Sequence, residues 1–368
     1  MSKLFTPIRI GAFDLNHRVV LAPLTRMRAE MPGNIPGQAM VDYYTQRATK
    51  GGLLIAEATY IARTGNGGYA SPGIETDVQV AGWRKVVEAV HARGATILLQ
   101  LWHVGRVSHE SLQPDGGQPV APSAIAVAGL GTLLEGGYGG ATPPRALTVD
   151  EIAGVVAQYR AAAERAKAAG FDGIEIHGAN GYLIDQFLQD GSNHRTDSYG
   201  GSIANRTRFL FEVVDAVTTV WDAARIGVRV GPSNRFNEMQ DSDPTALFAH
   251  VAAGLRDRGI AYLHVIEPRI TGNAEIEAAA PSAAASLKPV FQGPVIAAGG
   301  FDREQALAIV EKGGADLVAF GRHFIANPDL PRRLRAGLPL NAYDRETFYY
   351  GGAKGYADYP AHEAAQVA

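Results

Sequence analysis

The stretch VDEIAGVVAQYRAAAERAKAAGFDGIEIHGA, Val149–Ala179, contains one helix and one strand in direct succession. Apolar residues recur at helical period over Val149–Ala169, and Thr148 forms a capping box with Glu151 three residues later. The apolar face of this helix consists of Ile152, Val155, Val156, Tyr159 and Ala163. The next run, Gly173–Ala179, is rich in apolar residues, which is typical of a parallel strand buried on both faces. A helix followed by a buried strand indicates an α/β fold.

The same alternation runs along the whole chain. Further apolar runs predict strands at Arg18–Thr25, Leu53–Thr59, Thr96–His103, Ile226–Pro232, Tyr262–Glu267, Val295–Gly300 and Leu317–Arg322. Helical periodicity predicts helices at Asp77–Arg93, Ile203–Trp221, Pro244–Asp257, Asp302–Lys312 and Asn327–Arg335. Because the count of strands is eight, a closed (β/α)8 TIM barrel is favoured over an open sheet.

One connection, Val104–Leu147, is too long for an ordinary strand-to-helix loop. It is rich in glycine and leaves the third strand at the rim where barrels carry their active sites. We therefore expect an active-site lid, with a merely decorative surface insertion as the alternative. The predicted organisation is one barrel domain over residues 1–360, with this lid at about 104–147 and a disordered tail at 361–368.

Composition excludes several classes of protein. The 368 residues include no cysteine, so disulfides, thiolate zinc sites, iron–sulfur clusters and cysteine nucleophiles are ruled out. The formal net charge of −3 gives no support for nucleic-acid binding. No apolar stretch is long enough to span a membrane, and the first residues lack the apolar core of a signal peptide. We expect a cytoplasmic monomer or homodimer with no metal, nucleic acid or membrane partner.

Glycines and an arginine follow the last two strands. Barrels frequently bind phosphate there through backbone N–H groups, and Gly299, Gly300 and Gly321 allow close approach of the backbone. Arg322 adds a charge-assisted donor. These residues predict a phosphate site, although tight strand-to-helix turns explain the same glycines.

Arg229 lies in the middle of the fifth strand, so its charge is expected to be buried. A buried charge without a partner is costly. Arg229 therefore requires an anion or a polarised ligand oxygen, or else an internal ion pair with Glu57 or Glu175.

Polar and aromatic residues also gather at the ends of the third and fourth strands. Gln100 and Trp102 lie two residues apart and share one strand face, which is either the ligand site or ordinary core. His177 and Asn180 are two donors able to bind one substrate oxygen, and Tyr182 is a candidate general acid. A structural histidine is the plainer alternative.

Other chemistries lack their signals. No His-x-His pair supports a metallohydrolase barrel, and no lysine at a predicted strand end supports a Schiff-base aldolase. No Rossmann, P-loop or Gly-x-Ser-x-Gly motif occurs in the required context. A phosphate site, a buried arginine, an amide and a phenol together fit an FMN enzyme.

The chain resembles the old yellow enzymes, FMN-dependent ene-reductases, and within them the bacterial branch of N-ethylmaleimide reductase and pentaerythritol tetranitrate reductase. The resemblance runs from LFTPIRIG near the start to GYADYP at Gly355–Pro360. It is carried by APLTRMRA, QLWHVGR, GFDGIEIHGANGYLIDQFLQD, NHRTDSYGGSIANR, VAFGRHFIANPDLP and FYYGG.

The resemblance implies a role for each site residue. Flavin-ring contacts fall on Pro23, Leu24, Thr25, Ala58, Gln100 and Arg229, and phosphate contacts on Gly299, Gly300, Gly321 and Arg322. His177 and Asn180 match the pair that binds the substrate oxygen, and Tyr182 matches the proton donor. The residues Trp102, Tyr69 and Tyr349 match positions lining the substrate pocket.

The implied reaction is ping-pong reduction of activated C=C bonds in unsaturated carbonyls, maleimides and nitroalkenes by NADPH or NADH. The chain departs from its bacterial relatives at Asn180, where some have a second histidine, and at Tyr350, where glycine is expected. The segments Ser233–Asp243 and Pro268–Pro281 also differ, which leaves substrate scope open.

Three alternatives follow from the same residues. A dienoyl-CoA reductase-like relative needs an iron–sulfur cluster, which the absence of cysteine argues against. A flavin-free, phosphate-binding barrel lyase or aldolase predicts a colourless protein. A non-catalytic flavin-binding protein predicts no turnover.

Overall fold

Eight parallel strands close into a barrel in the computed structural model, which describes residues 2–128, 131–272, 274–276, 282–349 and 352–362. Strand neighbours follow chain order, and the last strand closes on the first with Ala319 opposite Val20. The strands are β3 (Val19–Leu21), β4 (Leu53–Tyr60), β5 (Thr96–Trp102), β10 (Gly173–Gly178), β11 (Ile226–Val230), β12 (Tyr262–Ile266), β15 (Val295–Ala298) and β16 (Leu317–Phe320). The predicted TIM barrel is confirmed.

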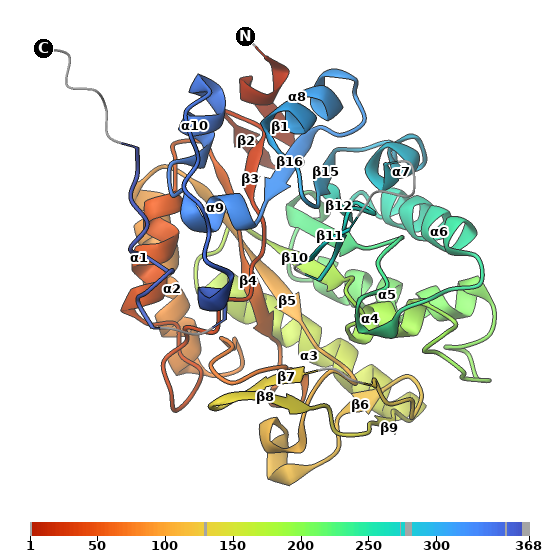
Figure 1. The fold of residues 1–368 in the computed structure, drawn as a ribbon. Helices are drawn as coiled ribbons and strands as arrows, with labels where there is room; N and C mark the ends of the chain where they lie inside the picture. The colour runs from red at the N-terminus through yellow and green to blue at the C-terminus, as the bar shows by residue number, and fades with distance from the viewer. Residues whose placement is uncertain (1, 129–130, 273, 277–281, 350–351, 363–368) are drawn as a thin grey trace, which may run out of the picture.

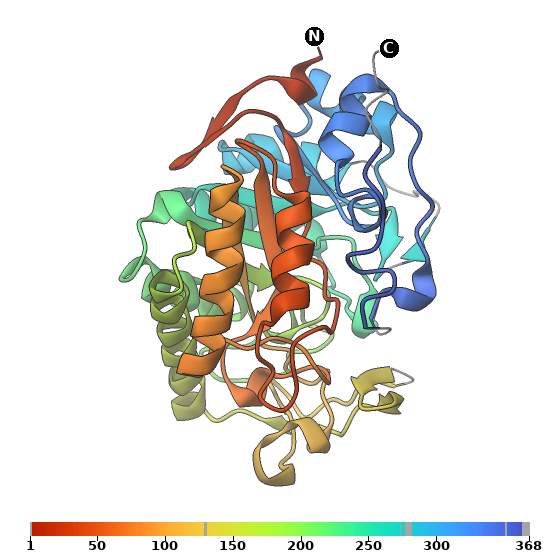
Figure 2. The same ribbon diagram turned by 90° about the vertical axis from the view of Figure 1, so that its left-hand side faces the viewer.

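Helices cover the outside of the barrel (Figures 1 and 2). They are α1 (Gln38–Arg47), α2 (Asp77–Ala92), α3 (Val149–Ala168), α4 (Leu183–Leu188), α5 (Ile203–Thr218), α6 (Pro244–Asp257), α7 (Ala283–Phe291), α8 (Arg303–Glu311), α9 (Arg322–Ala326) and α10 (Leu330–Ala336). The capping box of α3 is present, with the Glu151 N–H donating to Thr148 Oγ1 at 3.2 Å.

Four of these helices were not predicted: the short α4 and α9, and the longer α1 and α7. The buried face of α1 includes Arg47, which disguises its apolar period. Helix α7 contains Pro289, a residue that normally ends a helix. In both cases packing against the barrel outweighs the local signal.

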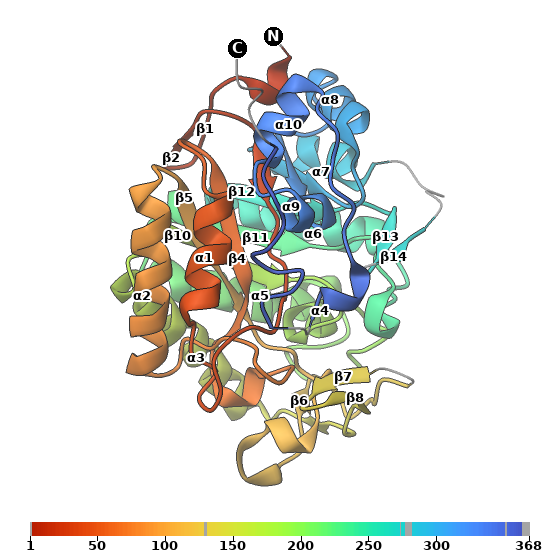
Figure 3. The same ribbon diagram turned by 60° about the vertical axis from the view of Figure 1, so that its left-hand side comes forward.

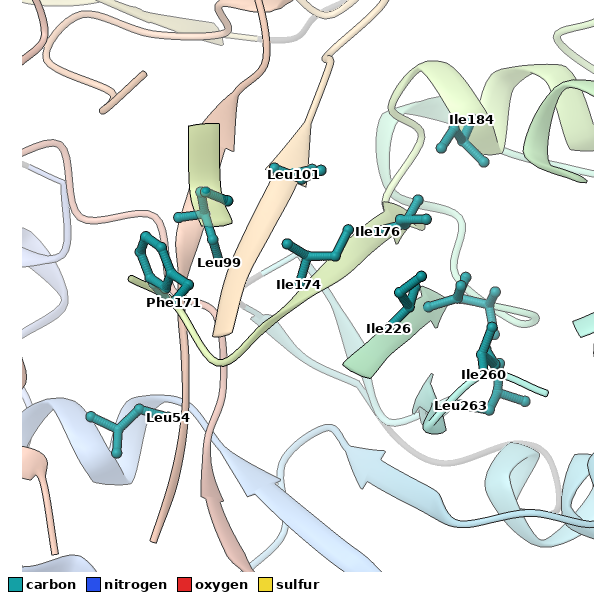
Figure 4. Packing of buried hydrophobic residues seen from close by; sticks show 14 of the residues in the cluster. Leu54, Leu99, Leu101, Phe171, Ile174, Ile176, Ile184, Ile226, Ile260 and Leu263 are labelled. Carbon is teal, nitrogen blue, oxygen red and sulfur yellow. The ribbon is translucent and has the colours of Figure 1, made fainter. Parts of the chain in front are cut away.

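Most of the apolar core lies between the strands and the surrounding helices, as Figure 4 shows for residues such as Leu99, Ile174 and Ile226. A second cluster fills the barrel interior and extends to the N-terminal hairpin of β1 (Ile8–Ile10) and β2 (Phe13–Leu15). This hairpin lies at one end of the barrel (Figures 1 and 3). It leaves the opposite end, where the strands finish, for a ligand.

The long connection after β5 holds more regular structure than expected. It contains β6 (Val120–Ala121), the antiparallel pair β7 (Gly131–Leu134) and β8 (Gly137–Gly140), and β9 (Arg145–Ala146). The β7–β8 hairpin lies at the opposite end of the molecule from β1–β2 (Figures 1 and 3). Tyr69 after β4 holds it there, because its N–H donates to Leu133 O at 2.7 Å. No helix among the described residues is long and apolar enough to cross a membrane.

Candidate active site

A cavity of about 610 Å³ opens at the carboxyl ends of the barrel strands. This volume falls in the range of small-molecule sites. All but one of the predicted site residues line it: Pro23, Leu24, Thr25, Ala58, Gln100, Trp102, His177, Asn180, Tyr182, Arg229, Gly299, Gly300, Gly321, Arg322 and Tyr349.

Tyr69 is the predicted site residue that does not line this cavity. Its side chain is half-buried, and its hydroxyl donates to Glu135 Oε1 at 3.1 Å. Glu135 lies in the turn of the β7–β8 hairpin. In this structure Tyr69 therefore attaches the hairpin to the barrel.

A buried carboxylate, Glu175 of β10, organises the polar residues in the barrel interior. Glu175 accepts hydrogen bonds from Gln100 Nε2 at 2.7 Å, Tyr262 Oη at 3.0 Å and His264 Nδ1 at 2.8 Å. Burial opposes its charge, but His264 and Arg229 lower the pKa of Glu175 below its usual value overall. Glu175 is therefore ionised and acts as an acceptor.

Arg229 lies beside this group on β11, opposite His177 on one side and His264 on the other. It is buried, yet its guanidinium makes no hydrogen bond or ion pair with any described residue, and its Nε is fully enclosed without a partner. Neither Glu57 nor Glu175 forms the internal ion pair considered above: Glu57 instead accepts from Arg26 N–H at 3.2 Å. The cavity thus presents a cation that interacts with Glu175 through its charge but makes no hydrogen bond or ion pair with a described residue.

The residues predicted to bind phosphate lie together at another wall of the cavity. Gly299 and Gly300 have φ values of +126° and +63°. Residues with a side chain rarely adopt such values, so these positions favour glycine. Arg322 forms an ion pair with Glu275 of the short strand β14 (Ala274–Glu275), and its Nη1 is enclosed without a hydrogen-bond partner. Open backbone beside an incompletely paired arginine suits a phosphate group.

His177 and Tyr182 pack against each other at the cavity wall. Their rings meet edge to face at 5.1 Å, and Tyr182 makes the same contact with Trp102 at 5.1 Å. Burial and then the neighbouring Arg229 lower the pKa of His177 well below its usual value. Burial raises the pKa of Tyr182 above its usual value. At neutral pH the site therefore holds an uncharged imidazole and a protonated phenol.

Asn180 completes this group from the turn between β10 and α4. It adopts the left-handed conformation, with φ +59°, and Gly181 follows with φ +70°. The Gly181 N–H donates to Asp185 Oδ2 at 2.8 Å, which anchors the turn to α4. The end of β10 and this turn together place His177, Asn180 and Tyr182 at one cavity.

Several cavity residues were not identified from the sequence. They include Phe236 and Asn237 from the loop after β11, Ile270, Thr271 and Ala274 from the connection after β12, Phe348 near the C-terminus, and Thr132, Leu133 and Tyr138 from the β7–β8 hairpin. The hairpin lies within the lid predicted at about 104–147. Phe236 and Asn237 belong to Ser233–Asp243, and Ile270, Thr271 and Ala274 to Pro268–Pro281, the two segments that the resemblance gives as unlike those of relatives. Tyr350 lies outside the described residues.

The segment near the C-terminus that includes Phe348 forms one wall of the cavity, and Arg26 holds it in place. Arg26 is fully buried and donates to Phe348 O at 2.8 Å and Gly355 O at 2.7 Å. Its guanidinium also lies 5.0 Å from the Tyr356 ring centroid. Arg26 immediately follows Thr25, so the chain that lines the cavity on one side also fixes its C-terminal wall.

Comparison with known proteins identifies the family. A model described as "NADH:flavin oxidoreductase / NADH oxidase family" matches residues 3–341. The chain belongs to this family, the old yellow enzymes. It is 48% identical to putative 12-oxophytodienoate reductase 11 of Oryza sativa subsp. japonica over 97% of each chain. It is 47% identical to flavin oxidoreductase hxnT of Emericella nidulans over 98% of each chain.

The structure of morphinone reductase in complex with tetrahydroNAD superimposes on this old yellow enzyme with a TM-score of 0.93. That structure is 48% identical and covers 99% of this chain and 98% of its own. The cofactors of the present family member are accordingly FMN and NADH or NADPH. The chain is an FMN-dependent NAD(P)H oxidoreductase.

Proposed function

We propose that this old yellow enzyme reduces C=C bonds activated by a carbonyl, imide or nitro group. The observation that carries the proposal is the convergence of His177, Asn180 and Tyr182 beside the unpaired Arg229 in one cavity. Two neutral donors suit an oxygen that gains negative charge, and a protonated phenol suits proton delivery.

The residues present fit FMN. Gln100 and Arg229 offer an amide and a cation to the polar edge of a flavin ring, and the enclosed, unpartnered Nε of Arg229 supports this assignment. Gly299, Gly300, Gly321 and Arg322 would hold the phosphate, with Arg322 exchanging Glu275 for it. When bound, FMN supplies the hydride that NAD(P)H has donated.

His177 and Asn180 bind the activating oxygen of the alkene. Their hydrogen bonds draw electron density from the β-carbon and strengthen as negative charge develops on the oxygen. Tyr182 then transfers its proton to the α-carbon. Its raised pKa keeps that proton in place until the carbon is basic enough to take it.

The β7–β8 hairpin covers the substrate side of the cavity. Thr132, Leu133 and Tyr138 contribute to the lining, and Tyr69 links the hairpin to the barrel through Glu135. We infer that this lid excludes water and limits the size of the alkene.

The test combines a spectrum with a single turnover. The purified protein should be yellow, with flavin absorption at about 450 nm. After anaerobic reduction by NADPH or NADH, addition of 2-cyclohexenone should restore that absorption. A colourless protein would favour the flavin-free lyase, and a yellow protein that neither nicotinamide reduces would favour the non-catalytic flavoprotein. Reduction without reoxidation by enones, maleimides or nitroalkenes would contradict the proposed substrate class.

A further inference from the structure

Asn234 contacts Asn180, one of the two residues proposed to bind the substrate oxygen. It lies in the loop between β11 and α6, is buried, and its Nδ2 is 2.5 Å from Asn180 Oδ1. Asn234 is not among the site residues that the resemblance implies. Its contact is with the side chain of Asn180, the part expected to meet the substrate.

The hydrogen bonds determine which way both amides point. Amide oxygen and nitrogen are assigned from their partners. The backbone N–H of Phe236 can only donate, and it lies 2.9 Å from Asn234 Oδ1. Asn234 must therefore turn its Nδ2 toward Asn180, and Asn180 must accept with its Oδ1. The Nδ2 of Asn180 is left without a hydrogen bond to the described chain, so its two hydrogens are free for the cavity.

The loop that carries Asn234 is held on both sides. Asn237 Nδ2 donates to Asn180 O at 2.7 Å, which joins the loop to the β10–α4 turn. Arg106 Nη2 donates to Asn237 O at 2.9 Å, and Arg106 Nη1 donates to Ile125 O at 3.3 Å. Asn234 is thus fixed relative to Asn180 by contacts from the barrel and from the connection after β5.

We propose that Asn234 is a positioning residue that locks Asn180 as a hydrogen-bond donor, so that the enzyme selects substrates with an acceptor oxygen. The inference rests on the proposed function, in which Asn180 and His177 bind that oxygen. Without Asn234, the Asn180 amide can turn by 180° and present its oxygen, which repels a carbonyl or nitro group.

Asn234→Asp tests this proposal directly. The aspartate still accepts from Phe236 N–H, but it now offers Asn180 an oxygen, so the Asn180 amide should reverse. We expect about 10²-fold weaker binding of phenol to the oxidised holoenzyme, followed by its charge-transfer band with FMN, and a similar fall in kcat/KM for 2-cyclohexenone. Ser233→Asp is the matched control, because Ser233 is the exposed neighbour and adds the same charge without touching Asn180.

A double-mutant comparison separates positioning from general damage. In an Asn180→Ala background, Asn234→Asp should change phenol binding by less than about twofold. Asn234→Ala should weaken phenol binding by at least about twofold in the wild-type background, because the amide then samples both orientations. Unchanged phenol binding in both Asn234 variants, or an equal loss in the Asn180→Ala background, would overturn the proposal. Phenol binding needs no turnover, so failure of the ene-reductase function would be seen separately as absent enone reduction by the wild type.

Discussion

Gln100 and Glu175 lie opposite each other on β5 and β10, joined by a 2.7 Å hydrogen bond from Gln100 Nε2 to Glu175 Oε1. The ionised carboxylate can only accept, so this contact orients the Gln100 amide at the floor of the cavity. The same carboxylate receives Tyr262 and His264. One acidic residue of β10, beneath the proposed flavin site, therefore aligns side chains from two other strands, β5 and β12.

Glu175→Gln should lower the free energy of unfolding of the holoenzyme by about 1–3 kcal/mol, because three buried donors then share one amide oxygen. Urea unfolding followed by far-UV circular dichroism measures this loss. Glu88→Gln on the exposed side of α2 is the matched control. Equal stability of the two variants would show that the Glu175 network contributes little.

Arg229→Met should weaken cofactor binding far more than it weakens the apoprotein. In the protein without FMN, the buried guanidinium makes no hydrogen bond or ion pair with the described residues and acts only through its charge on Glu175, so its loss should lower the melting temperature only slightly. FMN affinity should fall at least tenfold, since the anion-binding group is gone. Thermal unfolding of the apoprotein and quenching of flavin fluorescence give the two values. A strongly destabilised apoprotein would indicate an internal partner for Arg229.

Protonation of His177 and deprotonation of Tyr182 should impose no pH dependence on the oxidation of the reduced enzyme by 2-cyclohexenone between about 6 and 9. Burial keeps the pKa of His177 below this window and the pKa of Tyr182 above it. Neither group changes charge there: His177 gains a proton only at lower pH, and Tyr182 loses one only at higher pH. Single-turnover measurements across the window provide the check. A transition centred near 6.5 would show that His177 titrates with an ordinary pKa.

Tyr182→Phe should slow enone reduction by about 10²–10⁴-fold while sparing reduction of FMN by NADPH. The phenylalanine ring keeps the packing against Trp102 and His177, so the loss isolates the phenolic proton. Stopped-flow measurement of each half-reaction separates the two steps. Strongly activated nitroalkenes should suffer less. An unaltered rate with 2-cyclohexenone would remove Tyr182 from its proposed role.

Much of the fold was predictable because its signals are local. Buried parallel strands such as Val295–Ala298 are apolar throughout, and the capping box at Thr148 marks the start of α3 in four residues. The rim position of His177, Asn180 and Tyr182 then follows from strand direction alone. Helices α1 and α7 could not be predicted in this way, because a buried Arg47 in α1 and an internal Pro289 in α7 mask the apolar periodicity.

Contacts between distant segments could be found only in three dimensions. Whether Arg229 pairs with Glu57 or Glu175 depends on side-chain positions across the barrel, and neither pair forms. The hydrogen bond from Asn234 to Asn180 joins residues 54 positions apart in the sequence. The hydrogen bond from Tyr69 to Glu135 joins residues 66 positions apart. Periodicity and capping report on neighbours along the chain, so they locate the strands, the helices and the strand ends that form the rim. The orientation of each polar group at that rim depends on which donors and acceptors barrel closure brings together.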